Sequence, residues 1–258
     1  MEHPPYPETT MVLPHFDAHW LHFAAVVAVQ LVLLVVVARI RRGGRSEVVR
    51  ALAVGLGAGL VLGAAFDLII GSAQGVFSYH LPPAAVFIFA NGLLSYGLAC
   101  ATAWFFPVVL TLAAPDVRRR GGVILALAAA AAVVLLTGPW TVPAWGRMVA
   151  SGAAILATGE LGVTVLGRTG PLLQCVQGNC SSLLGLWRWS VLTGLVYELA
   201  NVFFPVWTWS ALASWPVLLR EAVIVVFGYV VLCHPLVLVG RLLIARPPST
   251  TCPTPREA

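Results

Sequence analysis

Three carboxyl side chains, those of Asp67, Glu160 and Glu198, lie inside long apolar stretches of the sequence. Only 10% of the residues are charged, whereas 59% are hydrophobic. A carboxyl group inside a bilayer is costly, so it usually faces the interior of a helix bundle and marks a reactive site, an ion path or a polar partner. We therefore take these three residues as the catalytic candidates.

Acid catalysis on an apolar substrate is the chemistry that suits such carboxyls best. A low-dielectric site favours the neutral acid, which can protonate an alkene or an epoxide. Aromatic faces stabilise the resulting carbocation by cation–π attraction. Aromatic residues are expected in the same outer halves of the helices as the carboxyls: Phe87, Phe89, Tyr96, Tyr197, Phe203 and Phe204. The alternative is that these rings pack against neighbouring helices or lipid.

Polar residues are also expected near Asp67 and Glu198. Asn201 lies three residues after Glu198, so the two side chains share a helix face. The substrate-binding residues that we predict are Asn91, Tyr96, Tyr197, Asn201, Phe204 and Arg220. In the alternative interpretation the cluster is structural. Arg220 then neutralises Asp67 or Glu198, and the two asparagines satisfy the remaining polar atoms.

Glu160 stands apart from this cluster, in the inner half of its apolar stretch. Gly159 and Gly162 flank it and would let another helix approach closely. One interpretation is an acid or proton-relay residue. The other is a carboxyl paired with Arg168 or with Arg188.

Histidine and cysteine residues give weaker signals. His15, His19 and His22 have the i, i+4, i+7 spacing that can share a metal ion on one helix face, but histidine is also common at membrane interfaces. Cys175 and Cys180 form a single pair without a second pair, which is a poor zinc motif, and the cytoplasm keeps thiols reduced. We predict two free thiols, no metal and no cofactor.

The apolar runs that hold these residues predict an all-α, multi-pass membrane protein. The mean hydropathy of +0.91 lies outside the range of soluble domains. At ~20 residues per span there is room for about seven helices. The expected spans are roughly 20–38, 51–71, 84–113, 121–138, 148–167, 183–204 and 216–245. Pro107 should kink the third of these near its end.

Arginine and tryptophan set the expected orientation. Loops 39–50 and 118–120 are rich in arginine, whereas loops 72–83 and 205–215 contain none. The positive-inside rule therefore places the N-terminus outside the cell membrane and the C-terminus inside, and the tryptophan-rich loops agree with it. Arg147 is the exception. We expect an extracytoplasmic segment over 1–17, a seven-helix domain over 18–245 and a disordered cytoplasmic tail over 246–258.

Several function classes are excluded by composition. The chain has no lysine, so it cannot form the Schiff base of a retinal protein, and its net charge of +5 comes from arginine at the ends of apolar runs rather than from a nucleic-acid surface. The sequence favours a membrane-bound cyclase or isomerase whose partners are the bilayer and a hydrophobic, isoprenoid-like or terpenoid-like small molecule. In size and in this chemistry the chain is similar to small seven-span terpene cyclases. A small proton- or cation-coupled transporter and a non-catalytic membrane subunit are the open alternatives.

Overall fold

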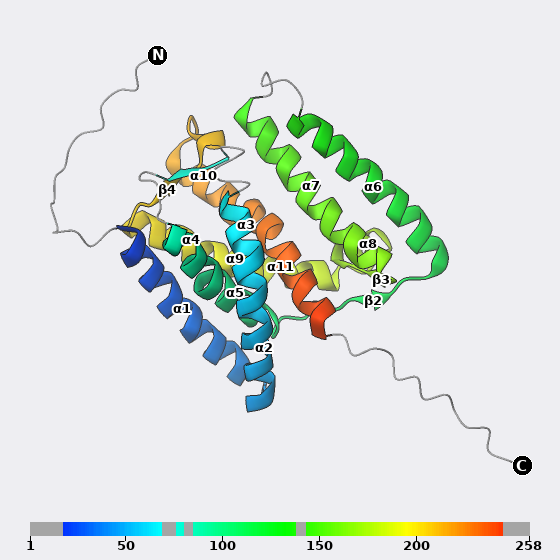
Figure 1. Ribbon diagram of the computed structural model, residues 1–258, viewed down its shortest axis with the longest axis horizontal. Helices are drawn as coiled ribbons and strands as arrows, with labels where there is room; N and C mark the ends of the chain where they lie inside the picture. Colours follow the sequence, from blue (N-terminus) through cyan, green and yellow to red (C-terminus); the bar gives the residue numbers. More distant parts are fainter. Residues whose placement is uncertain (1–17, 69–75, 80–84, 138–142, 245–258) are drawn as a thin grey trace, which may run out of the picture.

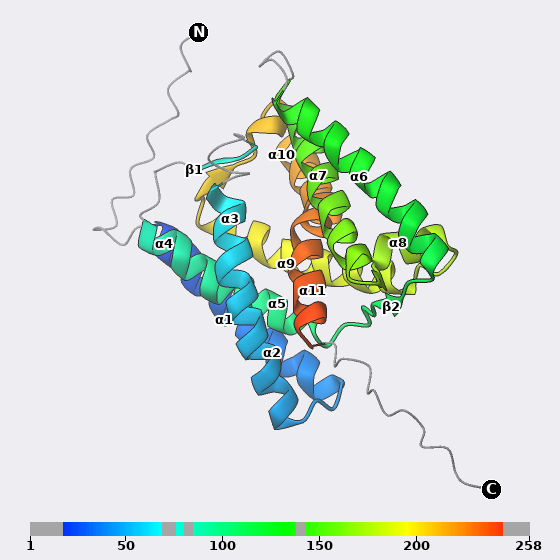
Figure 2. The same cartoon turned by 45° about the vertical axis from the view of Figure 1, so that its right-hand side comes forward.

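A computed structural model describes residues 18–68, 76–79, 85–137 and 143–244 (Figures 1 and 2). The described part of the chain is mainly helical, which confirms the all-α class. The predicted terminal segments 1–17 and 246–258 lie outside the described residues, and so does His15.

Eleven α-helices are described: α1 (Ala18–Ile40), α2 (Arg45–Ala58), α3 (Ala64–Phe66), α4 (Ala85–Ala90), α5 (Gly97–Ala103), α6 (Pro115–Thr137), α7 (Ala144–Val165), α8 (Pro171–Val176), α9 (Ser181–Phe203), α10 (Val217–Val223) and α11 (Tyr229–Ile244). Wider π-helical segments join three pairs of them without a break. These are η1 (Gly59–Gly63) between α2 and α3, η3 (Asn91–Tyr96) between α4 and α5, and η5 (Ile224–Gly228) between α10 and α11. A short 3-10 turn, η4 (Ser210–Leu212), precedes α10.

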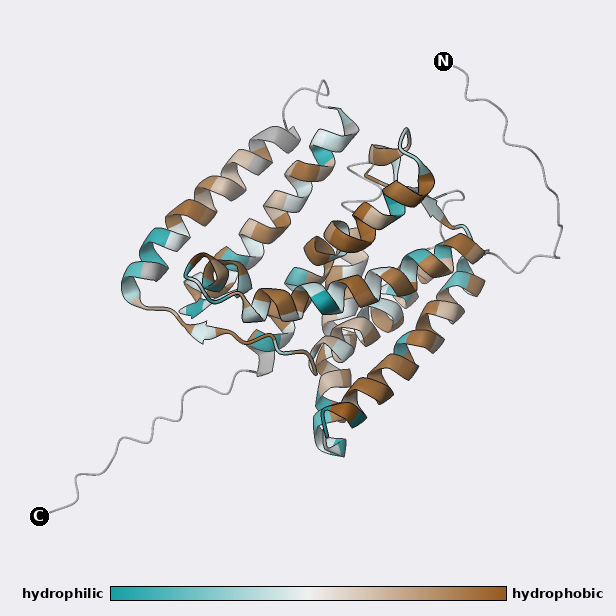
Figure 3. Ribbon diagram, turned by 180° about the vertical axis from the view of Figure 1, so that it is seen from behind, coloured by the Kyte–Doolittle hydropathy of each residue, from teal (hydrophilic) through white to brown (hydrophobic). Residues whose placement is uncertain are grey.

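Five described helical runs are long and apolar enough to cross a membrane: His19–Ile40, Arg45–Phe66, Val86–Ala103, Trp145–Val165 and Val217–Leu242. Their length and composition are consistent with a membrane protein. The fourth and sixth expected spans correspond to α6 and α9, each 23 residues long, which are not among the five. Figure 3 shows hydrophobic residues along the length of α1 and hydrophilic ones near the start of α2 and of α6.

The third expected span is shorter than predicted. Helix α5 ends at Ala103, and Pro107 lies beyond it in an irregular stretch, so the expected kink at Pro107 is wrong. The backbone N–H groups of Trp104 and Phe105 already turn to carbonyls three residues back, at 3.3 and 3.1 Å. The helix thus tightens and ends before the proline, whose ring disfavours helical conformation in the preceding residue.

Glycine lets the second and third helical runs pack backbone to backbone. Gly55, Gly59 and Gly63 recur every fourth residue and face η3 and α5. A Cβ on Gly59 would lie 2.6 Å from the carbonyl oxygen of Gly92, and one on Gly55 would lie 2.6 Å from that of Gly97. Small residues at this spacing are the usual device for close helix contact in membranes. The contact places the end of α3, and Asp67 after it, against η3.

Two short antiparallel ribbons join loops at the two ends of the bundle. β1 (Ser78–Tyr79) pairs with β4 (Trp207–Thr208), and β2 (Thr111–Leu112) pairs with β3 (Arg168–Thr169). Helix α7 packs on α11, and α6 lies against the outer side of α7 (Figures 1 and 2). The α6–α7 hairpin therefore stands at the edge of the bundle.

Candidate active site

Asp67 is buried, with 1% of its surface exposed, and it is held by donors from the neighbouring helical run. The side-chain amide of Asn91 donates to Oδ2 at 3.2 Å, and the hydroxyl of Tyr96 donates to Oδ1 at 3.0 Å. Tyr79, on the β1 ribbon, also hydrogen-bonds to Asp67. Burial first, and then the nearby Asp67, raises the pKa of Tyr79 above its ordinary value, so this phenol stays protonated and can donate.

Glu198 is the second buried carboxyl, with 4% of its surface exposed on α9. Its Oε1 atom accepts hydrogen bonds from the Trp209 indole at 3.1 Å and from the Tyr229 hydroxyl at 3.0 Å. Its Oε2 atom accepts no hydrogen bond from a described donor. Asn201, expected to support Glu198, instead binds the chain after α9, where its side chain contacts the backbone of Val206 and Trp207.

A third carboxyl lies beside Glu198. Glu221, on α10, interacts directly with Glu198 and forms an ion pair with Arg220 at 2.8 Å. The expectation that Arg220 neutralises Asp67 or Glu198 is therefore wrong, because the arginine pairs with the next residue along its own helix. Two carboxyl groups in contact repel each other unless one carries a proton. The arrangement thus provides a place for a proton between Glu198 and Glu221.

Three tyrosines connect the two buried carboxyls. The ring centroids of Tyr96 and Tyr197 lie 5.6 Å apart, and those of Tyr197 and Tyr229 lie 5.9 Å apart. Tyr96 donates to Asp67 at one end of the row, and Tyr229 donates to Glu198 at the other. Asp67 and Glu198 therefore border one aromatic cluster. Tyr96 and Tyr197 were expected there, whereas the expected Phe89 and Phe203 are 54% and 69% exposed.

A small cavity lies within this cluster. Eight of its eleven lining residues are aromatic, and the other three are Asp67, Asn91 and Leu232. Its volume of about 20 Å³ suits a single water or a reacting group of similar size. Of the predicted binding residues, Asn91, Tyr96 and Tyr197 line the cavity, whereas Asn201, Phe204 and Arg220 are not part of the lining.

Two larger grooves meet this cavity at Phe66 and Leu232, which line all three spaces. One groove, of about 380 Å³, runs between α7 and the η5–α11 run. The other, of about 490 Å³, runs between α7, the η1–α3 run and α11. Their walls are mainly aliphatic, and Ser151 and Ile155 of α7 contribute to both.

Glu160 forms a separate polar contact, with a partner other than the expected Arg168 or Arg188. Its Oε1 atom lies 2.9 Å from Nε2 of His234 and accepts the backbone N–H of Leu172 at 3.0 Å. Both side chains of the pair are fully buried. The predicted close approach at Gly159 is confirmed, since a Cβ there would lie 3.0 Å from the His234 ring, whereas Gly162 faces open space.

Removing one member of this pair should destabilise the fold. We expect Glu160→Ala to lower the free energy of unfolding by about 3 kcal/mol or more, because a buried partner is left uncompensated. Thermal unfolding in a mild detergent measures the change, with the exposed Thr158→Ala on the same helix as control. Equal unfolding midpoints for the two variants would show that the pair contributes nothing.

His19 and His22, the two described histidines whose spacing could have shared a metal ion, are packed among aromatic rings. His19 lies 5.0 Å from the ring of Phe87, and His22 lies 4.6 Å from that of Trp207. In the described ranges, no three His, Cys, Asp or Glu side chains converge where they could hold a metal ion.

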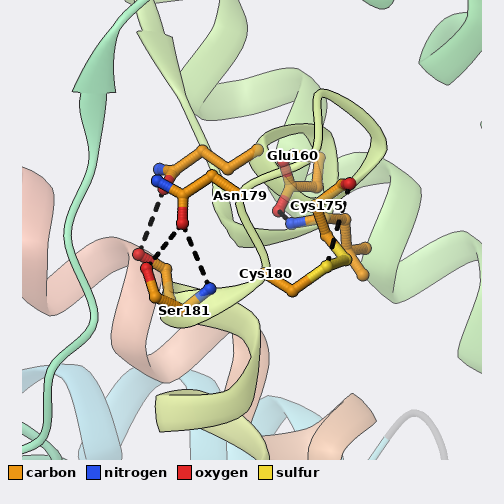
Figure 4. The surroundings of a disulfide bond; sticks show 8 residues. Glu160, Cys175, Asn179, Cys180 and Ser181 are labelled. Carbon is orange, nitrogen blue, oxygen red and sulfur yellow. Dashed lines mark hydrogen bonds between the residues drawn. A yellow bond between two sulfur atoms is a disulfide. The ribbon is translucent and has the colours of Figure 1, made fainter.

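Cys175 and Cys180 form a disulfide bond, so the prediction of two free thiols is wrong (Figure 4). Gly178 adopts a φ of 92° and reverses the chain after α8, which brings the two Cα atoms within 4.1 Å. The bond fastens the last turn of α8 to the start of α9. Because Leu172 of α8 donates to Glu160, the disulfide also steadies the loop that covers the Glu160–His234 pair.

Mass tagging of thiols tests this bond. The chain has five cysteines, so denatured protein from non-reduced membranes should take up three maleimide tags, and five after reduction. The Cys175→Ser/Cys180→Ser double variant should take up three under both conditions. Five tags on the wild type without reductant would contradict the bond and place the loop in a reducing compartment.

Some residues of this site were not predicted. Trp209, Tyr229 and Glu221 surround Glu198, and His234 pairs with Glu160. Only His234 gave a usable signal, as a lone histidine in an apolar run.

No protein-family model, curated protein or solved structure matches the chain.

Proposed function

We propose that the protein is an integral membrane enzyme that isomerises or cyclises a lipid-soluble, isoprenoid-like substrate by acid catalysis. The observation that supports this most is a cavity walled by aromatic rings, with the buried carboxyl of Asp67 in its lining. The second buried carboxyl, Glu198, accepts hydrogen bonds from two residues of the cavity wall, Trp209 and Tyr229. Such walls stabilise a carbocation without offering it a strong nucleophile. A membrane location fits the five long apolar helices.

The surroundings of the two carboxyls favour different roles. Glu198 lies beside the carboxyl of Glu221, and its Oε2 atom accepts no hydrogen bond from a described donor, which suits the protonated acid. Asp67 accepts hydrogen bonds from Asn91 and Tyr96, which suits the ionised base. Glu198 then supplies the proton through the Tyr229 hydroxyl, which lines the cavity: Tyr229 gives its proton to a carbon or epoxide oxygen of the substrate and takes one from Glu198. Asp67 removes a proton from a carbon next to the cation. The reaction is balanced, and a proton passing back from Asp67 to Glu198 restores the enzyme without a co-reactant.

A cation-coupled transporter is less well supported by the geometry. Such a protein needs polar groups that continue from Glu198 towards Glu160. The groove that extends from Tyr96 to Gly159 and Pro235 has mainly aliphatic walls, and neither Glu198 nor Glu160 lines it. An apolar passage of this kind suits a hydrocarbon better than an ion.

We propose seven membrane passes, with the N-terminus outside and the C-terminus inside. Arginine-rich loops support this orientation. The disulfide favours the opposite orientation, because disulfides persist outside the cytoplasm. It lies on the loop at the arginine-rich end of the bundle, where Arg118 donates to the carbonyl of Val165. A C-terminal alkaline phosphatase fusion decides between the two: it should be inactive, and an active fusion would reverse the assignment.

A comparison of neutral-lipid extracts tests the reaction itself. Cells that supply isoprenoid precursors and express the protein should accumulate a product with the same mass as its precursor but a different retention time, since the proposed reaction adds and removes one proton. The matched control is cells that express Glu198→Gln. An unchanged profile in cells with inserted wild-type protein would favour the transporter or the non-catalytic subunit.

A further inference from the structure

We infer that the grooves beside α7 bind a neutral or cationic, single-chain lipid whose small head group reaches the carboxyl cavity past Phe66 and Leu232. This inference rests on the proposed function for the role of the cavity. It adds the path of access and the class of substrate.

The sizes of the cavity and of the two grooves limit the shape of the ligand. The cavity holds about 20 Å³, so only a group the size of a hydroxyl, an epoxide or a short alkene segment fits beside Asp67. The adjoining grooves hold about 380 and 490 Å³, within the usual range of ligand pockets. A molecule that uses all of them has a slender hydrocarbon body and a small reactive end.

The charges around the cavity limit the charge of the head group. Asp67 lines the cavity, and Glu198 lies behind its wall, where it accepts hydrogen bonds from Trp209 and Tyr229. Glu221 lies beside Glu198, and Arg220 is already paired with Glu221. An anionic head group would meet repulsion and a loss of hydration there. Phosphates, diphosphates and free fatty acids are therefore disfavoured, whereas alcohols, epoxides, alkenes and amines are not.

The position of the grooves indicates how the lipid enters. Val149 and Phe227, which line the groove beside α11, are 60% and 66% exposed on the lateral surface of the bundle. Both belong to helical runs that are apolar enough to cross a membrane. A lipid can thus move from the bilayer into the groove without passing through water.

Photolabelling tests the site without a need for turnover. The probe is a farnesol analogue that carries a diazirine and an alkyne, applied to the full chain in phosphatidylcholine nanodiscs. Labelled peptides should come from α7 and from η5–α11. Unlabelled farnesol at ten times its Kd should reduce labelling about tenfold by simple occupancy, whereas farnesyl diphosphate and palmitate should not compete.

Two groove variants and one control make the test specific. Ala154→Trp fills the groove beside α3, and Gly152→Leu fills the groove beside α11, where an added Cβ would lie an ordinary 3.5 Å from Val231. Both should reduce labelling several-fold, and Gly152→Leu serves if Ala154→Trp does not fold. Ala128→Trp, exposed on α6, should label like the wild type.

Two results would overturn the inference. One is labelling spread evenly over α1 and α6, and the other is equal competition by farnesyl diphosphate. Failure of the proposed function looks different: the probe would still label the groove, but neither the wild type nor any variant would change an isoprenoid. Glu198→Gln separates the two further, since it should bind the probe normally and lack turnover.

Discussion

Replacing Glu198 by glutamine should reduce turnover by roughly a hundredfold or more, which is the usual contribution of a positioned general acid. The variant keeps the shape of the side chain and the acceptor oxygen for Trp209 and Tyr229, but it cannot give a proton. Product formation per molecule of inserted protein, measured in lipid extracts of expressing cells, quantifies the loss. Asp67→Asn should cause a loss of similar size, because it removes the base.

Glu221→Gln provides a graded comparison. In the proposed mechanism Glu221 only helps Glu198 to keep its proton, so this variant should retain more activity than Glu198→Gln. It should also shift the pH dependence of turnover, which a purely structural role would not do. Full activity in both Glu198→Gln and Asp67→Asn, with normal insertion, would show that the carboxyls are structural.

Replacing Gly59 by alanine should destabilise the bundle by about 1–3 kcal/mol or more, the usual cost of overpacking a tight core. Its Cβ would lie 2.6 Å from the carbonyl oxygen of Gly92, and the backbone of a packed helix has little freedom to move away. The unfolding midpoint in detergent should fall. Activity should fall with it, because this contact brings Asp67 to Asn91 and Tyr96.

Gly57 is the matched control on the same helical run. A Cβ there would meet nothing within 4 Å, so Gly57→Ala removes a flexible residue from a helix without a clash. Helix propensity then favours alanine by about 1 kcal/mol, and the midpoint should stay level or rise. If the two variants shift the midpoint equally, the glycine contact between the helices is not tight.

The sequence predicted that Asn91 would approach Asp67, and this is confirmed by the hydrogen bond between them. That Tyr96 binds the same carboxyl could not be foreseen from α-helical spacing. Residues five apart in an α-helix turn by about 500°, which puts them roughly 140° apart around the axis. The segment from Asn91 to Tyr96 is π-helical, and hydrogen bonds from i to i+5 align residues at this spacing. Both donors therefore face Asp67.

One further feature of the site had a signal in the sequence. The recurrence of Gly55, Gly59 and Gly63 at every fourth residue indicates a close helix contact, and it would have placed the second helical run against a partner. The partners of Glu198 carried no such signal. Trp209 follows a loop and Tyr229 follows a π-helical segment, so their distance from Glu198 along the chain says nothing of their position in space.

Because the groove beside α11 opens sideways at Val149 and Phe227, the bilayer is the solvent that would deliver the proposed substrate. The concentration that governs the rate is then a mole fraction among lipids, not an amount per litre of buffer. Inert phospholipid added at constant enzyme and substrate dilutes the substrate in two dimensions and slows the reaction, whereas added buffer changes nothing. The product leaves by the same route, so it inhibits until it spreads through the membrane or another protein removes it.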